Sequence, residues 1–203
     1  MNKTLIKDAL ILFVITAVAG LLLGIVYDIT KDPIAVQQQK LKEEAYQTVF
    51  SDADSFAEYD YTNASEVLRS AGIEAADVTI DEVMAAMKGS DVLGYVMTVT
   101  DHEGYGGDIQ IAVGIQSDGT VNGISFLSIG ETAGLGMKAK EPAFYQQFAG
   151  KKVDSFVYTK TGASGENEID ALTGATITTN AVTNAVNGAI CYFQSIEGGS
   201  GNE

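Results

Sequence analysis

The most continuous hydrophobic pattern lies close to the N-terminus. Residues 9–26 contain no charged side chain. Roughly 18 residues at about 1.5 Å per residue form a helix about 27 Å long, which matches the hydrocarbon core of a bilayer. The run is longer than the apolar core of a signal peptide, and no Ala-x-Ala-like cleavage site follows Val26. The pattern therefore predicts one uncleaved transmembrane helix over residues 9–27, in contact with membrane lipid.

The lysines on the two sides of this run predict its orientation. Lys3, Lys7 and the terminal amine precede the run, whereas the lysines that follow it, Lys31, Lys40 and Lys42, alternate with acidic residues. Lysine and arginine are enriched on the cytoplasmic side of membrane proteins. We therefore expect residues 1–8 in the cytoplasm and the remainder of the chain on the outer face of the membrane.

Residues 28–89 are predicted to form a linker helix and the first part of a soluble domain. Asp32 followed by Pro33 is typical of a helix start. Apolar residues then recur at helical spacing as far as Val49. We therefore expect an amphipathic helix over residues 33–50.

Two further signals lie in this first part of the soluble domain. Residues 51–65 are polar and acidic, which predicts a loop. Thr79 and Glu82 have the spacing of a capping box, in which two side chains satisfy the first free N–H groups of a helix. This spacing predicts a short helix that ends at Gly89.

Alternating apolar and polar positions in the middle of the chain indicate β-strands. The predicted strands cover residues 92–99, 108–116 and 121–129. Asp118 and Gly119 separate the last two, and an Asp-Gly pair is a strong hairpin signal. The pattern predicts an antiparallel meander, followed by a glycine-rich loop, a short helix and an edge strand at residues 130–140, 142–150 and 153–158.

The last hydrophobic stripe predicts a C-terminal helix. Its apolar positions follow helical spacing, at Val182, Val186, Ile190 and Phe193. Thr178 or Thr179 can cap its start, because a hydroxyl there accepts a hydrogen bond from an unpaired N–H group. We expect the domain to end at residue 193 and residues 194–203 to form a flexible tail. The predicted fold class is α+β, with an N-terminal transmembrane helix, an antiparallel sheet and flanking helices.

The junction before the last helix carries the main candidate chemistry. Residues 170–176 read Asp-Ala-Leu-Thr-Gly-Ala-Thr. Free N–H groups and the positive end of a helix dipole favour an anion such as phosphate at this position. Gly174 and Ala175 leave room for a bulky group, and Thr176 presents a hydroxyl there. The string Thr-Gly-Ala-Thr alone also suits an ordinary loop-to-helix junction with a threonine cap.

Composition excludes several other functions. The formal net charge is −15, and clustered Lys and Arg are scarce, which argues against a nucleic-acid partner. Cys191 is the single cysteine, so the chain has neither an internal disulfide nor a cysteine-based metal site. With one histidine and scattered acidic residues, we expect no metal site. His102 is expected to be an exposed loop residue without a functional role.

The wider pattern at residues 170–176 resembles the acceptor motif of covalently flavinylated proteins, Asp-x-x-Thr-Gly-Ala-Thr. In these proteins a flavin transferase moves FMN from FAD onto the last threonine as a phosphoester. The resemblance implies that Thr176 carries covalent FMN. Two more stretches resemble the same FMN-binding domain family, Gly-Tyr-Gly-Gly at residues 104–107 and Glu-Thr-Ala-Gly-Leu-Gly at residues 131–136. Ala133 stands where the family has proline, which loosens the loop but keeps the turn.

This resemblance covers residues 90–193, and the N-terminal span fits the same family. The chain is similar to the G subunits of Rnf complexes, the ion-translocating ferredoxin:NAD oxidoreductases of bacterial membranes. The resemblance implies an electron-relay subunit of a translocase, without independent turnover, whose covalent FMN lies outside the cytoplasmic membrane. Its implied partners are the other Rnf membrane subunits and the flavin transferase. Which ion is moved stays open.

The resemblance also assigns residues to the flavin. Besides Thr176, Gly174 and Ala175 at the attachment site, the candidates for the ring and ribityl chain are Tyr105, Glu131, Thr132, Gly134, Leu135, Gly136, Lys138, Asp170 and Thr173. Glu131 and Thr173 either bond the flavin or hold their loops in place. Asp170 would repel a phosphate, so it pairs with backbone N–H groups or assists the transferase.

Three alternative functions remain open at this point. The chain could be a stand-alone flavinylated carrier for an extracellular reductase, or the C subunit of a sodium-pumping NADH:quinone reductase, which is usually longer. The third alternative is a membrane-anchored binding or scaffold domain without flavin. Detection of bound flavin in the protein would exclude this last alternative.

Overall fold

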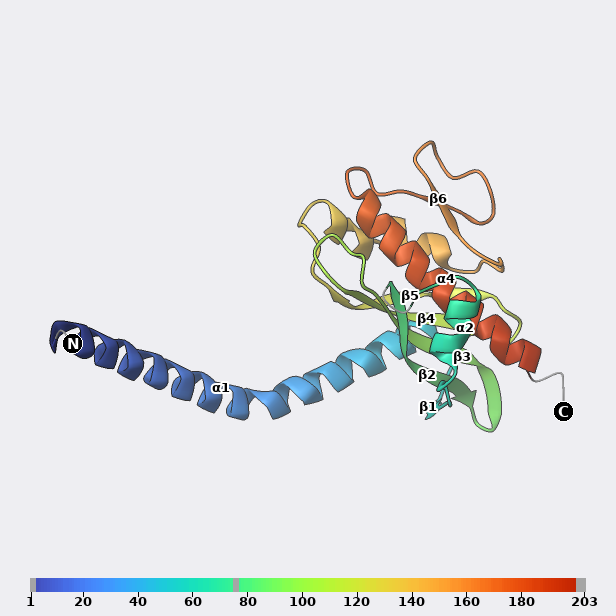
Figure 1. The fold of residues 1–203 in the computed structure, drawn as a ribbon. Helices are drawn as coiled ribbons and strands as arrows, with labels where there is room; N and C mark the ends of the chain where they lie inside the picture. The colour runs from blue at the N-terminus through green and yellow to red at the C-terminus, as the bar shows by residue number, and fades with distance from the viewer. Residues whose placement is uncertain (1–2, 75–76, 200–203) are drawn as a thin grey trace. The chain divides into compact units, whose positions relative to one another are not determined.

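The computed structural model describes residues 3–74 and 77–199, in which two units are distinguished (Figure 1). An anchor unit comprises Met1–Leu41, and a globular unit comprises Lys42–Glu203. One long helix, α1 (Lys3–Val49), forms the described part of the anchor unit. The last residues of α1 belong to the globular unit.

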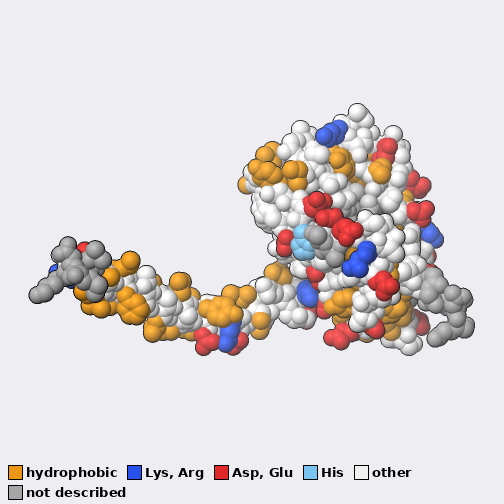
Figure 2. Space-filling model, viewed as in Figure 1, with side chains coloured by type: hydrophobic (Ala, Val, Ile, Leu, Met, Phe, Trp, Pro, Cys, Tyr) orange, Lys and Arg blue, Asp and Glu red, His pale blue; other side chains and the backbone are white. Residues whose placement is uncertain are grey.

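The anchor unit is an exposed apolar helix. Hydrophobic side chains cover much of it in the space-filling view (Figure 2), with a group of charged side chains part-way along, and large hydrophobic ones such as Leu12, Phe13 and Leu23 are exposed. Among the described residues, one helix is long and apolar enough to cross a bilayer, and it is α1. The hydrophobic run at residues 9–27 therefore forms the helix that its pattern predicts.

Helix α1 continues through Asp32, where the sequence pattern predicts a new helix start. Pro33 lies inside α1. A proline removes one N–H donor and crowds the preceding turn, which weakens a helix without always ending it. Here the apolar turns before Pro33 and the amphipathic turns after it both favour helix, so the two predicted helices form one element.

The globular unit is built on a five-stranded antiparallel sheet in the order β1-β2-β3-β4-β5 (Figure 1). Its strands are β1 (Ser55–Glu58), β2 (Val78–Lys88), β3 (Asp91–Asp101), β4 (Ile109–Gln116) and β5 (Val121–Ile129). The last three confirm the predicted meander. Strand β1 lies within the predicted loop at residues 51–65, and α2 (Ala64–Ser70) follows it.

The helix predicted from Thr79 to Gly89 is wrong, because this segment is strand β2. Val78, Ile80 and Val83 are buried on one face of the sheet, and the register shifts by one residue at Asp81. This bulge breaks the strict alternation that would have indicated a strand. The capping-box spacing is a local signal, whereas pairing with β3 extends over the whole segment, and pairing with β1 adds a second partner for residues 84–87.

Two helices cover opposite faces of the sheet. Helix α4 (Thr176–Gly199) packs on the face that includes Met97 and Val99 of β3, and its predicted apolar stripe is buried there. The end of α1 packs on the other face, against a second cluster that includes Val96. Successive strand residues point to opposite faces, so β3 contributes to both cores.

The sheet accommodates the end of α1 through small residues. A Cβ atom on Gly94 would lie 2.8 Å from the ring of Phe50, and one on Gly114 would lie 2.8 Å from Val49 Cβ. Glycine at these positions lets the last turn of α1 approach the strands closely. The globular unit therefore includes residues 42–50 in its packing.

Helix α4 differs from its prediction at both ends. It begins at Thr176, before the predicted caps Thr178 and Thr179, and it continues to Gly199. Ile196 is buried, so packing extends the helix into the predicted tail. Residues 200–203 of that tail lie outside the described residues.

Short elements connect β5 to α4. They are η1 (Gly136–Lys140), α3 (Pro142–Tyr145), η2 (Gln146–Phe148), β6 (Val157–Thr159) and β7 (Glu168–Asp170). The predicted edge strand at residues 153–158 overlaps β6 only at its end, and β6 pairs in parallel with β7 in a separate two-stranded sheet. Strand β7 ends just before the loop that leads to Thr176.

Candidate functional site

A pocket of about 500 Å³ lies at the N-terminal end of α4. Three segments far apart in the sequence line it: the loop between β3 and β4, the loop after β5 and the junction into α4. The lining residues are Tyr105, Glu131, Thr132, Leu135, Gly136, Gly174, Ala175, Thr176, Ile177 and Thr178. The fold thus brings the glycine-containing segments and residues 170–176 together.

The first two segments are joined by a buried carboxylate. Glu131 is 7% exposed, and its Oε1 accepts a hydrogen bond from the backbone N–H of Gly106 at 3.2 Å. A Cβ atom on Gly106 would lie 2.3 Å from the carbonyl oxygen of Gly130, so the two loops are in close backbone contact. Glycine is therefore required where these loops meet.

The junction into α4 is held by its own hydrogen bonds. The N–H of Ala175 donates to the carbonyl of Leu172 at 3.0 Å, and Gly174 takes a positive φ of 77°. The Thr179 hydroxyl accepts from the N–H of Leu172 at 3.0 Å and donates to the carbonyl of Ala175 at 2.9 Å. These contacts fix the turn, and Thr176, which is half-buried, lies at the first position of α4.

Four of the sequence-predicted residues lie outside the lining of this pocket: Asp170, Thr173, Gly134 and Lys138. Asp170 ends β7, and its Oδ1 accepts from the N–H of Ala163 at 2.5 Å. This contact is the backbone pairing expected for Asp170. Gly134 has a positive φ of 77°, which shapes the loop around the pocket.

Two lining residues were absent from the predicted set, Ile177 and Thr178. The apolar side chain of Ile177 is exposed at the rim. Thr178 is 1% exposed, and its hydroxyl has no hydrogen-bond partner among the described residues. The sequence offered Thr178 only as a helix cap, because its direction depends on packing against the loop after β5.

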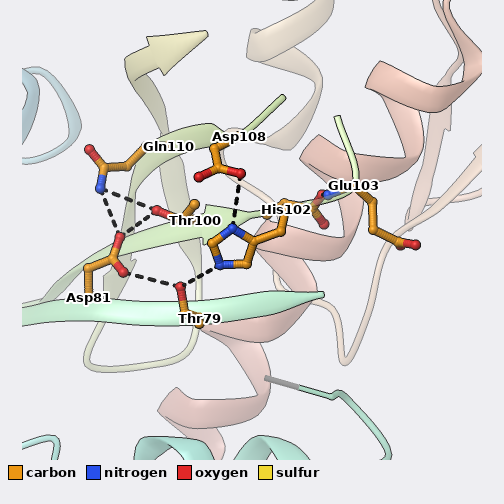
Figure 3. A network of polar contacts seen from close by, with 8 residues as sticks. Thr79, Asp81, Thr100, His102, Glu103, Asp108 and Gln110 are labelled. Carbon is orange, nitrogen blue, oxygen red and sulfur yellow. Dashed lines mark hydrogen bonds and ion pairs between the residues drawn. The ribbon is translucent and has the colours of Figure 1, made fainter. Parts of the chain in front are cut away.

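A polar network supports the strand ends from which the Tyr105 loop emerges (Figure 3). His102 contacts Asp108 Oδ1 through Nδ1 at 3.1 Å and Thr79 Oγ1 through Nε2 at 3.3 Å. Asp81 Oδ2 accepts from Thr100 and Gln110, at 2.5 and 2.8 Å. His102 is exposed, as expected, and it ties the two ends of the loop over residues 102–108 together.

A buried carboxyl lies at the base of the same loop. Asp101 is 0% exposed, and burial raises its pKa to about 6. Its Oδ1 accepts from the N–H of Glu103 at 2.9 Å, whereas Oδ2 has no partner within the described part of the chain. Ionisation of this carboxyl at neutral pH therefore reduces the stability of the folded protein.

Comparison with known proteins identifies the family. Residues 1–49 match the RnfG N-terminal region, and residues 104–191 match the FMN-binding domain. The G subunit of the Na⁺-translocating ferredoxin:NAD⁺ oxidoreductase complex of Acetobacterium woodii is 34% identical over 196 residues, 96% of this chain and 94% of that protein. The chain belongs to the RnfG family of ion-translocating oxidoreductase subunits.

Other members of the RnfG family align over most of their length. The G subunit of the proton-translocating ferredoxin:NAD⁺ oxidoreductase complex of Clostridium ljungdahlii is 32% identical, over 90% of this chain and 88% of that protein. The G subunit of the ion-translocating oxidoreductase complex of Methanosarcina acetivorans is also 32% identical, over 97% and 98%. The crystal structure of Shewanella oneidensis NqrC aligns at a TM-score of 0.49 and 19% identity, over 75% of this chain and 88% of that one.

Proposed function

We propose that this protein is the electron-transferring G subunit of an ion-translocating ferredoxin:NAD oxidoreductase complex, and that it carries FMN as a phosphoester on Thr176. One observation carries the attachment site. The Thr176 hydroxyl stands at the first position of a 24-residue helix, in the lining of the pocket that the family's glycine-rich loops complete. The other subunits of the complex perform the reactions with ferredoxin, NAD and the transported ion.

The residues of the pocket fit a flavin nucleotide. A phosphate at Thr176 would be stabilised by the free N–H groups and dipole at the start of α4. Tyr105, Leu135 and Ile177 are exposed at the pocket, at 71%, 44% and 51%, and they offer apolar surface to a flat ring. The buried hydroxyl of Thr178 and Glu131 Oε2, which both lie beside Gly136, are polar groups available to the edge of the ring.

Bound FMN supplies one-electron and two-electron redox chemistry, and the protein supplies attachment, orientation and electrostatics. Attachment to Thr176 is a transfer from FAD by a separate flavin transferase. The Thr176 oxygen forms a new bond to the phosphorus of the FMN half, the bond between the two phosphates breaks, and AMP leaves. The hydroxyl proton passes to a base of the transferase.

The covalent bond matters because the proposed location is outside the cell. A dissociable cofactor would be diluted there, whereas an ester removes the binding equilibrium. Helix α1 is proposed to anchor the chain in the cytoplasmic membrane, with residues 1–8 inside and the globular unit on the outer face. Protease added to intact cells is expected to cleave the globular unit; full protection until the cells are lysed would reverse this orientation.

The attachment site is tested with the full chain made together with a flavin transferase. The wild-type protein should give a fluorescent band on a denaturing gel, and the peptide containing Thr176 should be heavier by one riboflavin phosphate less water. Thr176→Ala should lose both signals and still fold, because the half-buried hydroxyl contributes little to the core. Thr132→Ala is the matched control, since it removes another hydroxyl from the same pocket.

Fluorescence that persists in Thr176→Ala would contradict the attachment site. A wild-type protein without flavin, made with an active transferase, would contradict the electron-transfer function itself. Assembly is tested separately by affinity purification from membranes, in which the other subunits of the complex should copurify. Solitary migration under mild detergent would count against assembly and favour a stand-alone carrier.

A further inference from the structure

Two buried polar groups flank Gly136 at the pocket. A Cβ atom built on Gly136 would lie 2.5 Å from Thr178 Oγ1 and 2.6 Å from Glu131 Oε2. The two oxygens therefore both border the place where a side chain at position 136 would lie, and only glycine fits there. We call this part of the pocket lining the niche. Thr178 is 1% exposed and Glu131 is 7% exposed, and both line the pocket.

The hydroxyl of Thr178 differs from those of neighbouring threonines on α4 in its hydrogen bonding. The Thr179 hydroxyl donates to the carbonyl of Ala175, and the Thr183 hydroxyl donates to the carbonyl of Thr179 at 2.7 Å. Both follow the common bond to the carbonyl four residues earlier. Thr178 Oγ1 makes no hydrogen bond to residues 3–74 or 77–199. A buried polar group without a partner destabilises the folded protein, so this position points to a ligand that supplies the partner.

The carboxylate of Glu131 defines what that ligand must offer. Its Oε1 is engaged by the N–H of Gly106, and Oε2 lies beside Gly136 with the Thr178 hydroxyl. An ionised carboxylate only accepts hydrogen bonds, whereas a hydroxyl can donate one. The niche therefore suits a donor and an acceptor that are adjacent on one ligand edge.

We infer that Thr178 and Glu131 together bind the imide edge of the flavin ring. This edge presents an N–H group between two carbonyl oxygens. Thr178 donates to one carbonyl and Glu131 Oε2 accepts from the N–H, so the niche sets the orientation of the ring. The inference rests on the proposed function, because it concerns the same flavin.

The test uses the full-length flavinylated protein and its Thr178→Val and Thr178→Ser variants. Valine has the shape of threonine without the hydroxyl, and serine restores the donor. With carbonyl-labelled flavin, isotope-edited infrared spectra should show a flavin carbonyl stretch at higher frequency in Thr178→Val than in the wild type. The flavin midpoint potential should also fall, because a donor at a carbonyl stabilises the reduced ring. Thr178→Ser should restore both values.

A carbonyl frequency and a potential that are unchanged in flavinylated Thr178→Val would overturn the inference. This outcome includes the case in which Thr178 bonds a ribityl hydroxyl instead. A wild-type protein without flavin is a different result, because it refutes the proposed function before the niche is probed. The matched control is Thr179→Val, which removes a neighbouring hydroxyl whose bonds lie within the protein.

A second readout separates a ligand contact from a structural role. In the flavin-free Thr176→Ala background, Thr178→Val should leave the thermal midpoint unchanged or raise it, since no protein hydrogen bond is lost. Thr179→Val should lower the midpoint in the same background. A loss caused by Thr178→Val that is as large as that of Thr179→Val would assign Thr178 to the fold and overturn the inference.

Discussion

At the scale of single residues, a buried carboxyl group whose ionisation is unfavourable lies at the start of the loop between β3 and β4. Asp101 is fully buried at the end of β3, and burial raises its pKa to about 6 from an ordinary value of 3.8. The folded protein therefore holds this proton more tightly than the unfolded chain does. The stabilisation that the tighter binding of this proton provides is complete below about pH 4 and is lost as the pH rises through 6.

Asp101→Asn should therefore stabilise the protein at neutral pH. A shift of about two pKa units corresponds to about 2–3 kcal/mol, and the neutral amide keeps an oxygen for the N–H of Glu103. The difference in free energy of unfolding between variant and wild type should grow by this amount between pH 4 and pH 7. Urea denaturation at a series of pH values measures it, and a difference independent of pH would contradict the assignment.

At the scale of secondary-structure elements, the end of α1 is bonded to the sheet through polar groups. Tyr46 is 4% exposed, and its hydroxyl donates to Glu82 Oε2 and contacts Thr98 Oγ1 at 2.7 Å. Burial raises the pKa of Tyr46, so the hydroxyl stays protonated. Burial of Glu82 opposes its ionisation, but hydrogen bonds from Lys42 and Tyr46 lower its pKa overall.

Tyr46→Phe should destabilise the globular unit by about 1–3 kcal/mol, because it leaves the fully buried hydroxyl of Thr98 without this partner. Thr98→Val in the same protein should recover part of the loss, since both partners are then apolar. A double-mutant cycle on free energies of unfolding measures the coupling. Strict additivity of the two changes would show that the hydrogen bond contributes nothing.

At the scale of the whole molecule, the division between the anchor and globular units predicts where the chain can be shortened. Residues from Lys42 onward contain both clusters of the core. These include Ala45, Tyr46 and Val49, which pack on the face of the sheet opposite α4. The exposed apolar residues of the anchor unit contribute to neither cluster. Residues 1–41, which hold the candidate membrane span, should therefore be removable without loss of the fold.

A chain that begins at Lys42 should be soluble and monomeric and should unfold cooperatively. A chain that begins at Ser51 is the matched comparison, because it uncovers Ala86, Val96 and Ala112 on the sheet. That chain should aggregate or unfold at a markedly lower temperature. Size-exclusion chromatography and thermal denaturation distinguish the two, and equal behaviour would refute a structural role for residues 42–50.

The sequence by itself determined the features that depend on local pattern. The apolar run near the N-terminus follows from its uninterrupted hydrophobic residues. The three central strands and the buried stripe of α4 follow from the spacing of their apolar positions. Eight of the twelve residues predicted to bind the flavin line the pocket. Their segments are rich in glycine, so each segment can be recognised separately in the sequence. The tertiary structure was still needed to bring those segments to one place.

Other features were decided only by tertiary contacts. Strand β2 formed despite a helix signal at Thr79 and Glu82, because pairing with β3 along its whole length outweighs a local cap. The direction of the Thr178 hydroxyl depends on how α4 packs against Gly136 and Glu131, which lie far from it in the sequence. Such long-range packing leaves no periodic trace in the chain, so only the folded structure shows it.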